Sequence, residues 1–213
     1  MNSRKTIRIL VECAIMIALG TALSLIKIFK LPFGGAVTLV SMLPVCLISV
    51  KYGDRVGLFA AFGYSLLQML IGLPEAVSWG LTPLVFAAMI VLDYLFAYTA
   101  LGLAGTFRKH GLPGILGGVG FALAARFLCH FASGVVLWGD YAADYGFSNP
   151  WIYSLVYNGS YMGLEIVFTG IVAAVLFQVK PIRVYLDPVG IERKTAEAAE
   201  TAEDTDPTDG FTD

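Results

Sequence analysis

Residues 126–161 read RFLCHFASGVVLWGDYAADYGFSNPWIYSLVYNGSY, a stretch that sets polar and aromatic side chains into otherwise membrane-like sequence. Four residues recur at four-residue intervals: Arg126, His130, Gly134 and Trp138. In a helix they form one stripe, on which the glycine leaves room beside the indole ring. Asn149-Pro150 then predicts the start of another helix, which carries Tyr153 and Asn158. The pattern indicates one wall of a small-molecule pocket.

The composition is that of an integral membrane protein. Of the 213 residues, 57% are hydrophobic and 14% are charged, and the mean hydropathy is +0.75, far from the values of an ordinary soluble domain. The formal net charge of -2 reflects mainly an acidic C-terminal segment, so it does not indicate nucleic-acid binding. The three cysteines lie in apolar runs rather than in paired loop positions, which argues against a disulfide framework or a metal site.

We expect an all-α fold with six transmembrane helices. Apolar runs place these helices at residues 7–29, 38–50, 56–73, 81–107, 112–138 and 151–179. The second run is shorter than the roughly twenty residues that cross a bilayer. The loop before it, KLPFGGAVT, contains Pro32, Gly34 and Gly35, so it is expected to form turns that lie over a site.

Basic residues that flank the spans gather on one side of the predicted bundle: Arg4, Lys5, Arg8, Lys51, Arg55, Arg108, Lys109, Lys180 and Arg183. The positive-inside rule makes this side cytoplasmic, so both termini are expected inside and the pocket opens outward. Residues 1–183 are expected to form the membrane domain. Residues 184–213 are acidic with few large apolar side chains, and we expect them to form a disordered cytoplasmic tail.

Ionisable side chains within spans cost about 2.5–3.5 kcal/mol each near a helix centre, so each one is a candidate for function. Five occur: Glu12, Asp93, Arg126, His130 and Glu165. Asp93 either pairs with Arg126 or faces a cationic ligand, and we favour the ligand. His130 is either satisfied by a carbonyl group or binds the ligand. We interpret Arg126 as a pairing residue for Asp93 or Glu165, and the two glutamates as mainly structural.

Two side chains indicate what kind of ligand the pocket accepts. Trp138 shares a face with His130, and an indole face beside a desolvated cation contributes about 2 kcal/mol. Trp151, by contrast, fits an interfacial aromatic belt. The amide of Asn158 offers donors and an acceptor, which suit an aminopyrimidine edge, and its burial is expected to need such a partner. We therefore expect a flat, cationic, nitrogen-rich ligand.

The first helix carries a different signal. Ala14, Ala18 and Ala22 recur at four-residue spacing, and small residues in this register let another helix approach closely. The approaching helix belongs either to this chain or to a partner protein. No Walker A glycine-lysine motif occurs in the sequence, so any use of ATP must come from another chain.

Several segments together resemble a known family. They are the pattern of His130, Gly134 and Trp138, the segment WIYSLVYNGSYM at 151–162, LDY at 92–94 and AIMIA at 14–18. In this combination the chain resembles the thiamine-specific substrate-binding (S) components of energy-coupling-factor (ECF) transporters, over nearly all of the sequence up to residue 183. The resemblance implies a six-helix protein of the bacterial plasma membrane that has no catalytic activity of its own.

The resemblance also implies roles for six residues in binding the ligand: Asp93, Tyr94, His130, Trp138, Tyr153 and Asn158. Trp138 would stack on thiamine, and Asp93 would compensate the thiazolium charge. The others would form hydrogen bonds, mainly around the pyrimidine, with Tyr94 as an additional candidate. Arg126 would hold the binding residues in place without contacting the ligand itself.

The same resemblance implies partner proteins. The face of Ala14, Ala18 and Ala22 would dock on the transmembrane coupling subunit, which two ATPase subunits drive. ATP would be used by those subunits, and this chain would hold no cofactor and no metal.

The chain also departs from the family pattern, and other functions stay open. Some members carry glutamate where this chain has Asp93, and the loop at 74–83 looks long, which leaves Trp79 unplaced. A close alternative is an S component for the precursor hydroxymethylpyrimidine. Two others are a proton-coupled carrier that works alone and an intramembrane enzyme that uses Asp93 and His130 as acid and base.

Overall fold

The computed structural model describes residues 3–186, so the predicted acidic tail lies almost entirely outside the described residues. Its elements up to the second long helix are α1 (Ser3–Ser24), β1 (Lys27–Lys30), η1 (Pro32–Gly34), β2 (Ala36–Thr38), α2 (Leu43–Tyr52) and α3 (Asp54–Val77). The remaining elements are α4 (Pro83–Met89), η2 (Ile90–Phe96), α5 (Ala97–Thr99), η3 (Ala100–Leu103), η4 (Arg108–His110), α6 (Gly111–Val136), η5 (Gly139–Tyr145), α7 (Pro150–Leu176) and α8 (Lys180–Leu186).

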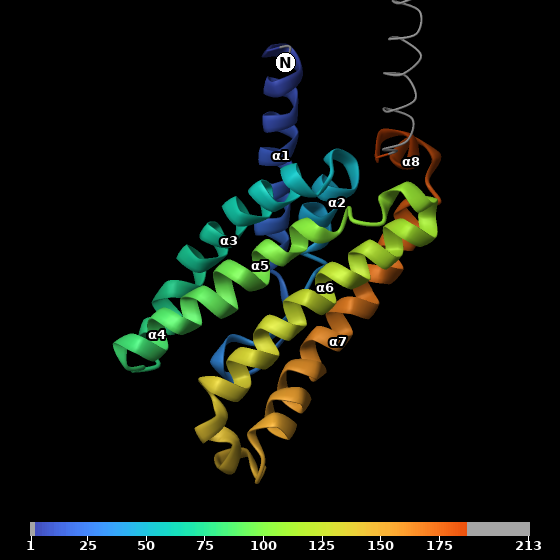
Figure 1. The fold of residues 1–213 in the computed structure, drawn as a ribbon. Coiled ribbons are helices and arrows are strands. Elements are labelled where there is room, and N and C mark those ends of the chain that lie inside the picture. The colour runs from blue at the N-terminus through green and yellow to red at the C-terminus, as the bar shows by residue number, and fades with distance from the viewer. Residues whose placement is uncertain (1–2, 187–213) are drawn as a thin grey trace, which may run out of the picture.

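The prediction of six apolar helices is confirmed. Five helical segments are long and apolar enough to cross a membrane, and α2 is a shorter sixth. The start of α1 and the short helix α8 lie at the same end of the bundle (Figure 1), as an even number of spans requires. At that end Glu12 forms ion pairs with Lys51 at 2.6 Å and with Arg8 at 2.9 Å, so its role in the described structure is structural, as expected.

α2 can be short because the protein itself surrounds it. Every residue of this helix except Tyr52 is buried, including Lys51. It lies within the main hydrophobic core, where its apolar side chains pack against residues of α3, α6 and α7. A helix enclosed by other helices need not match the thickness of the lipid.

The first span ends earlier than predicted. α1 stops at Ser24, and residues 27–30 instead pair with residues 36–38 in an antiparallel hairpin. The turn between the strands places Phe33 at φ 58° and Gly34 at φ 92°, left-handed conformations that reverse the chain within a few residues. The membrane-spanning bundle is all-helical, as predicted, and the structure adds a two-stranded hairpin between α1 and α2 in place of the predicted end of the first span.

The predicted loop at 74–83 is shorter in the structure. α3 continues through Pro74 to Val77, and only residues 78–82 connect it to α4. Proline interrupts a transmembrane helix less than a soluble one, because neighbouring groups re-satisfy the freed backbone. The extra helical turn carries Glu75 to the tip of the hairpin, where it pairs with Lys30.

The fourth span changes its winding in the middle. Thr82 caps α4 by accepting a hydrogen bond from the amide of Val85. Beyond Met89 the chain widens into the π-helical segment η2, which contains Asp93. Short π-helical segments are frequent at functional sites because the wider turn re-aims side chains.

Candidate ligand-binding site

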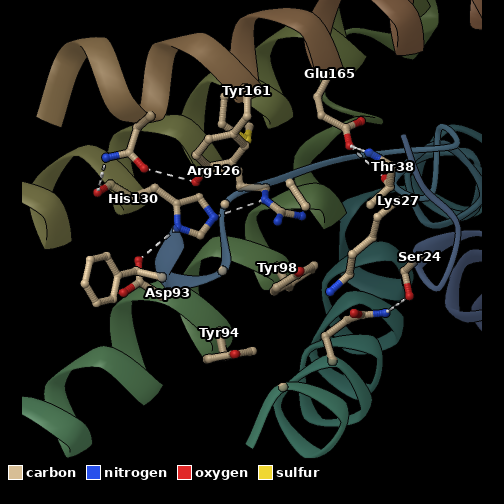
Figure 2. Close-up of a pocket in the computed structure, with 18 of the residues that line it drawn as sticks. Ser24, Lys27, Thr38, Asp93, Tyr94, Tyr98, Arg126, His130, Tyr161 and Glu165 are labelled. Carbon is tan, nitrogen blue, oxygen red and sulfur yellow. Dashed lines mark hydrogen bonds and ion pairs between the residues drawn. The ribbon is translucent and has the colours of Figure 1, made fainter. Parts of the chain in front are cut away.

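A cavity of about 430 Å³ lies between the hairpin and helices α3, η2, α6 and α7. Its volume falls in the range of small-molecule sites. All the site residues predicted from the sequence border it: Asp93, Tyr94, Arg126, His130, Trp138, Tyr153 and Asn158. Figure 2 shows several of these side chains converging from different helices.

Asp93 is held by two neutral groups. His130 donates from Nδ1 to Oδ1 of Asp93 at 2.9 Å, and the hydroxyl of Ser133 donates to Oδ2 at 2.5 Å. Nε of Arg126 donates to Nε2 of His130 at 3.3 Å, so Nε2 carries a lone pair and the imidazole is neutral. The carboxylate of Asp93 thus has no cationic partner among residues 3–186.

The prediction that Arg126 forms an ion pair with Asp93 or Glu165 is wrong. The ring of His130 stands between Arg126 and Asp93 (Figure 2). The guanidinium of Arg126 instead lies 3.8 Å from the ring centroid of Tyr98, a cation–π contact that the sequence did not indicate. Arg126 therefore supports His130 and leaves Asp93 free to face the cavity.

Glu165 has a structural role in the hairpin. Its side chain is 1% exposed, and Oε1 accepts hydrogen bonds from the amide of Thr38 at 2.5 Å and from its hydroxyl at 2.7 Å. This bond fixes β2 against α7. The structural interpretation made from the sequence is thus supported, but the partner is a threonine rather than Arg126.

Aromatic rings form the opposite part of the cavity. Trp138 lies 5.2 Å from Phe33 and 5.5 Å from Trp79, measured between ring centroids, and Tyr141 lies 5.8 Å from Trp138. Phe33 and Trp79 were missed as site residues. The turn residues around Phe33 did predict a loop over the site, but Trp79 reaches the cavity only because α3 extends beyond its predicted end.

The tyrosines of α7 line the wall below these rings. Tyr153 is packed against Tyr145 and Phe147, with centroid distances of 5.6 and 5.8 Å. One turn further, Tyr157 donates its hydroxyl hydrogen to the carbonyl of Pro32 and accepts from the amide of Gly35 at 3.2 Å. This helix therefore contributes both a cavity surface and the attachment of the hairpin turn.

Asn158 is buried, at 5% exposure, and the protein satisfies its amide. Nδ2 donates to the carbonyl of His130 at 3.2 Å and to the hydroxyl of Ser154 at 3.1 Å, while Oδ1 accepts from the hydroxyl of Tyr161 at 3.0 Å. The expectation that its burial needs a ligand is therefore wrong. Asn158 still borders the cavity, and it ties α7 to the helix that carries His130.

Gly134 has a different structural role from the expected one, which was to leave room beside the indole ring of Trp138. A Cβ at this position would lie 2.3 Å from Oγ of Ser154 and 2.8 Å from Nδ2 of Asn158, both on α7. The glycine therefore makes room for the neighbouring helix rather than for the ring of Trp138. Tyr94 is placed by a similar contact, since a Cβ on Gly72 of α3 would meet its hydroxyl.

The fold and this cavity define a class of protein, a small helical membrane protein that binds a ligand. Within residues 3–186 no group of three or more histidine, cysteine, aspartate or glutamate side chains is arranged to hold a metal ion. The cavity is lined by an uncompensated carboxylate, a neutral imidazole and several aromatic rings, which is the arrangement of a binding site.

The chain belongs to the thiamine transporter protein family (Thia_YuaJ), whose sequence model matches residues 10–184. It is 31% identical over 196 residues to the thiamine transporter ThiT of Bacillus subtilis (strain 168), covering 85% of this chain and 96% of the relative. It is 28% identical over 202 residues to ThiT of Lacticaseibacillus paracasei, covering 85% and 92%. A solved structure of ThiT from Listeria monocytogenes superposes with a TM-score of 0.67 at 25% identity, covering 83% of this chain and 97% of the other.

Proposed function

We propose that this chain is the thiamine-binding subunit of an ECF uptake transporter in the bacterial plasma membrane. One observation carries the proposal: the carboxylate of Asp93 faces a cavity that is lined by several aromatic rings, and its protein partners are both neutral. The side chain of Asp93 is 18% exposed, and a partly buried carboxylate within a membrane span is stabilised when a ligand supplies the missing cation. The thiazolium ring of thiamine is such a cation, and the relatives are named as thiamine transporters.

The aromatic part of the cavity suits the rest of such a ligand. Trp138 and Phe33 offer ring surfaces on which a flat heterocycle can stack. Tyr153 has a hydroxyl without a hydrogen-bond partner among residues 3–186, so it is available to the ligand. Asn158 and His130 would have to share hydrogen bonds with the ligand, because their own polar groups already have protein partners.

The partner proteins belong to the same proposal. Ala14, Ala18 and Ala22 are all exposed on α1, and large apolar side chains such as Ile15 and Leu19 are exposed beside them. A face of this kind suits close contact with another transmembrane helix. We infer that it docks on the ECF coupling subunit, that ATP is used by the two ATPase subunits, and that this chain holds no cofactor.

Titration of the detergent-purified protein with thiamine, followed by tryptophan fluorescence, tests the binding role. The wild type should show saturable quenching. Asp93→Asn and Trp138→Ala should each weaken binding by at least about tenfold, since each loses a charged or cation–π contact of 1.5–3 kcal/mol. Asp144→Asn and Trp151→Ala are matched controls, because both residues are exposed and neither borders the cavity.

The outcomes separate the remaining functions. Absence of any response to thiamine in folded wild-type protein would contradict the proposal. Hydroxymethylpyrimidine lacks the thiazolium cation, so binding of that compound with equal strength in wild type and Asp93→Asn would favour the precursor. Uptake into liposomes that contain only this chain would favour a solitary carrier, and conversion of bound thiamine to another compound would favour an enzyme.

A further inference from the structure

The end of the bundle at which α1 begins has exposed cations that residues 3–186 leave unpaired. α8 and the junction of α2 with α3 lie at the same end (Figure 1). The exposed basic side chains on these elements are Arg4, Lys5, Arg8, Arg55, Lys180 and Arg183. Within the described residues only Arg8 of this set forms an ion pair, with Glu12 at 2.9 Å. Unpaired surface cations are ordinary in themselves, so what matters is whether an anion is held near them.

The contacts of α8 fix where the rest of the chain starts. Nζ of Lys51 on α2 lies 3.2 Å from the ring centroid of Tyr185 on α8, and the same amine pairs with Glu12 of α1 at 2.6 Å. Leu186, the last described residue, is 2% exposed and packs in the main core. These contacts hold the end of α8 against α1 and α2, so the chain beyond Leu186 begins beside α1.

The chain beyond this point is the acidic part of the sequence. Residues 187–213 contain nine aspartate and glutamate residues and two basic ones, whereas residues 1–186 contain seven acidic and twelve basic residues. From residue 195 onward there are seven acidic residues and neither lysine nor arginine. The two parts of the chain therefore carry opposite net charges, and the acidic part is attached at the end where exposed cations lack partners.

The distances allow the acidic segment to reach these cations. From Glu12 to Arg4 the helix rises about 12 Å, and residues 187–194 can span up to roughly 27 Å when extended. A segment attached so close to a surface meets it at an effective concentration in the range of about 1 mM or more. Charges that come within the Debye length of about 8 Å attract each other even at physiological salt.

We propose that residues 195–213 dock on a basic surface formed by Arg4, Lys5, Lys180 and Arg183 of the same chain. Charge complementarity and attachment favour this occupant over an external one, because seven carboxylates are tied beside four unpaired cations. The docked segment covers the start of α1 and competes there with the anionic headgroups of the membrane and with acidic surfaces of partner proteins. The family model matches residues 10–184, so this contact is a regulatory addition outside the matched segment.

Carbodiimide cross-linking of the full-length protein tests this contact, because the reagent joins a carboxylate to an amine only when the two groups touch. The protein is placed in nanodiscs of phosphatidylcholine with one copy per disc, which excludes links between copies. Mass spectrometry should find residues 195–213 joined to Lys5 and Lys180. Raising the salt concentration from about 0.05 M to about 0.5 M should lower the yield by at least about fivefold, since screening weakens exposed charge pairs.

A double variant keeps both reactive lysines and changes only the charge around them. Arg4→Gln combined with Arg183→Gln should lower the yield by at least about threefold, because the surface loses two of its four cations. Lys30→Gln is the matched control near the tip of the hairpin, and it should leave the yield within about twofold because it lies far beyond a Debye length. All three substituted side chains are exposed, so melting temperatures equal to that of the wild type should show that the variants are folded.

The outcomes separate docking from its alternatives. A yield that is equal at both salt concentrations, or unchanged in the double variant, would reduce the contact to random collision and overturn the docking. Nanodiscs with about one third phosphatidylglycerol supply competing anions. Cross-links that persist in these discs support the docked segment, whereas cross-links that vanish there assign the basic surface to lipid headgroups and overturn the proposal.

Discussion

The two sides of the cavity are held in different ways. On one side, α6 and α7 are in direct contact along Gly134, and Asn158 and Ser154 join them by hydrogen bonds to backbone carbonyls. On the other side, the hairpin is attached by the packing of apolar side chains from its turn and from β2, by a few polar bonds from Tyr157 and Glu165, and by one exposed ion pair. The first arrangement resists any change in spacing, whereas the second depends on separate contacts that can be removed one at a time.

The largest effect is expected where the helices touch. In Gly134→Ala the new methyl group would lie 2.3 Å from Oγ of Ser154, so α7 or its side chains must move. Overpacking of this kind costs about 1–3 kcal/mol, and we expect a lower melting temperature and at least about tenfold weaker thiamine binding. Gly163→Ala on α7 is the control, because a Cβ there meets nothing within 4 Å. Equal behaviour of the two variants would show that this contact does not set the geometry of the wall.

A smaller effect is expected from the hairpin turn. Tyr157→Phe keeps the ring but removes the hydroxyl that joins Pro32 and Gly35 to α7. Loss of a neutral hydrogen bond costs about 0.5–1.5 kcal/mol, so we expect roughly three- to tenfold faster release of thiamine. Stopped-flow fluorescence measures this rate, and Tyr145→Phe serves as the control on an exposed ring. A melting temperature that falls as far as in Gly134→Ala would contradict the idea that the hairpin is attached separately.

The smallest effect is expected from the exposed ion pair of Lys30 with Glu75. The two side chains are 48% and 38% exposed, and pairs of this kind contribute about 0–1 kcal/mol. The affinity for thiamine can be measured in the wild type, in Lys30→Met, in Glu75→Gln and in the double variant. The coupling free energy from this double-mutant cycle should be below about 1 kcal/mol and should decrease further at high salt. A coupling well above this value would place the ion pair among the main attachments of the hairpin.

The sequence was sufficient to predict which side chains border the cavity where their positions follow from helical periodicity. Spacing alone brought His130 and Trp138 to one face, and the cost of charge in lipid singled out Asp93. These residues do border the cavity. Their roles in binding remain predictions until ligand measurements test them.

The rest of the site depends on features that periodicity does not encode. Phe33 reaches the cavity through a left-handed turn, and Trp79 through a helix that continues past a proline. Asp93 lies in a π-helical segment, where the angle between successive residues differs from that of an α-helix. The hydrogen bonds of Asn158 come from α6 and from its own helix, so only the tertiary structure could show that its amide is satisfied without a ligand.

The shortness of α2 has an electrical consequence. Its ten residues rise about 15 Å, roughly half of a hydrocarbon core of about 30 Å, and the residues just before it already border the cavity. Water that fills the cavity would shorten the low-dielectric path beneath it, so a larger part of the membrane potential would fall across α2 and the segments packed around it. A cation that reaches Asp93 from outside would cross only part of the field before it binds. The remaining part would act on its passage past this short helix.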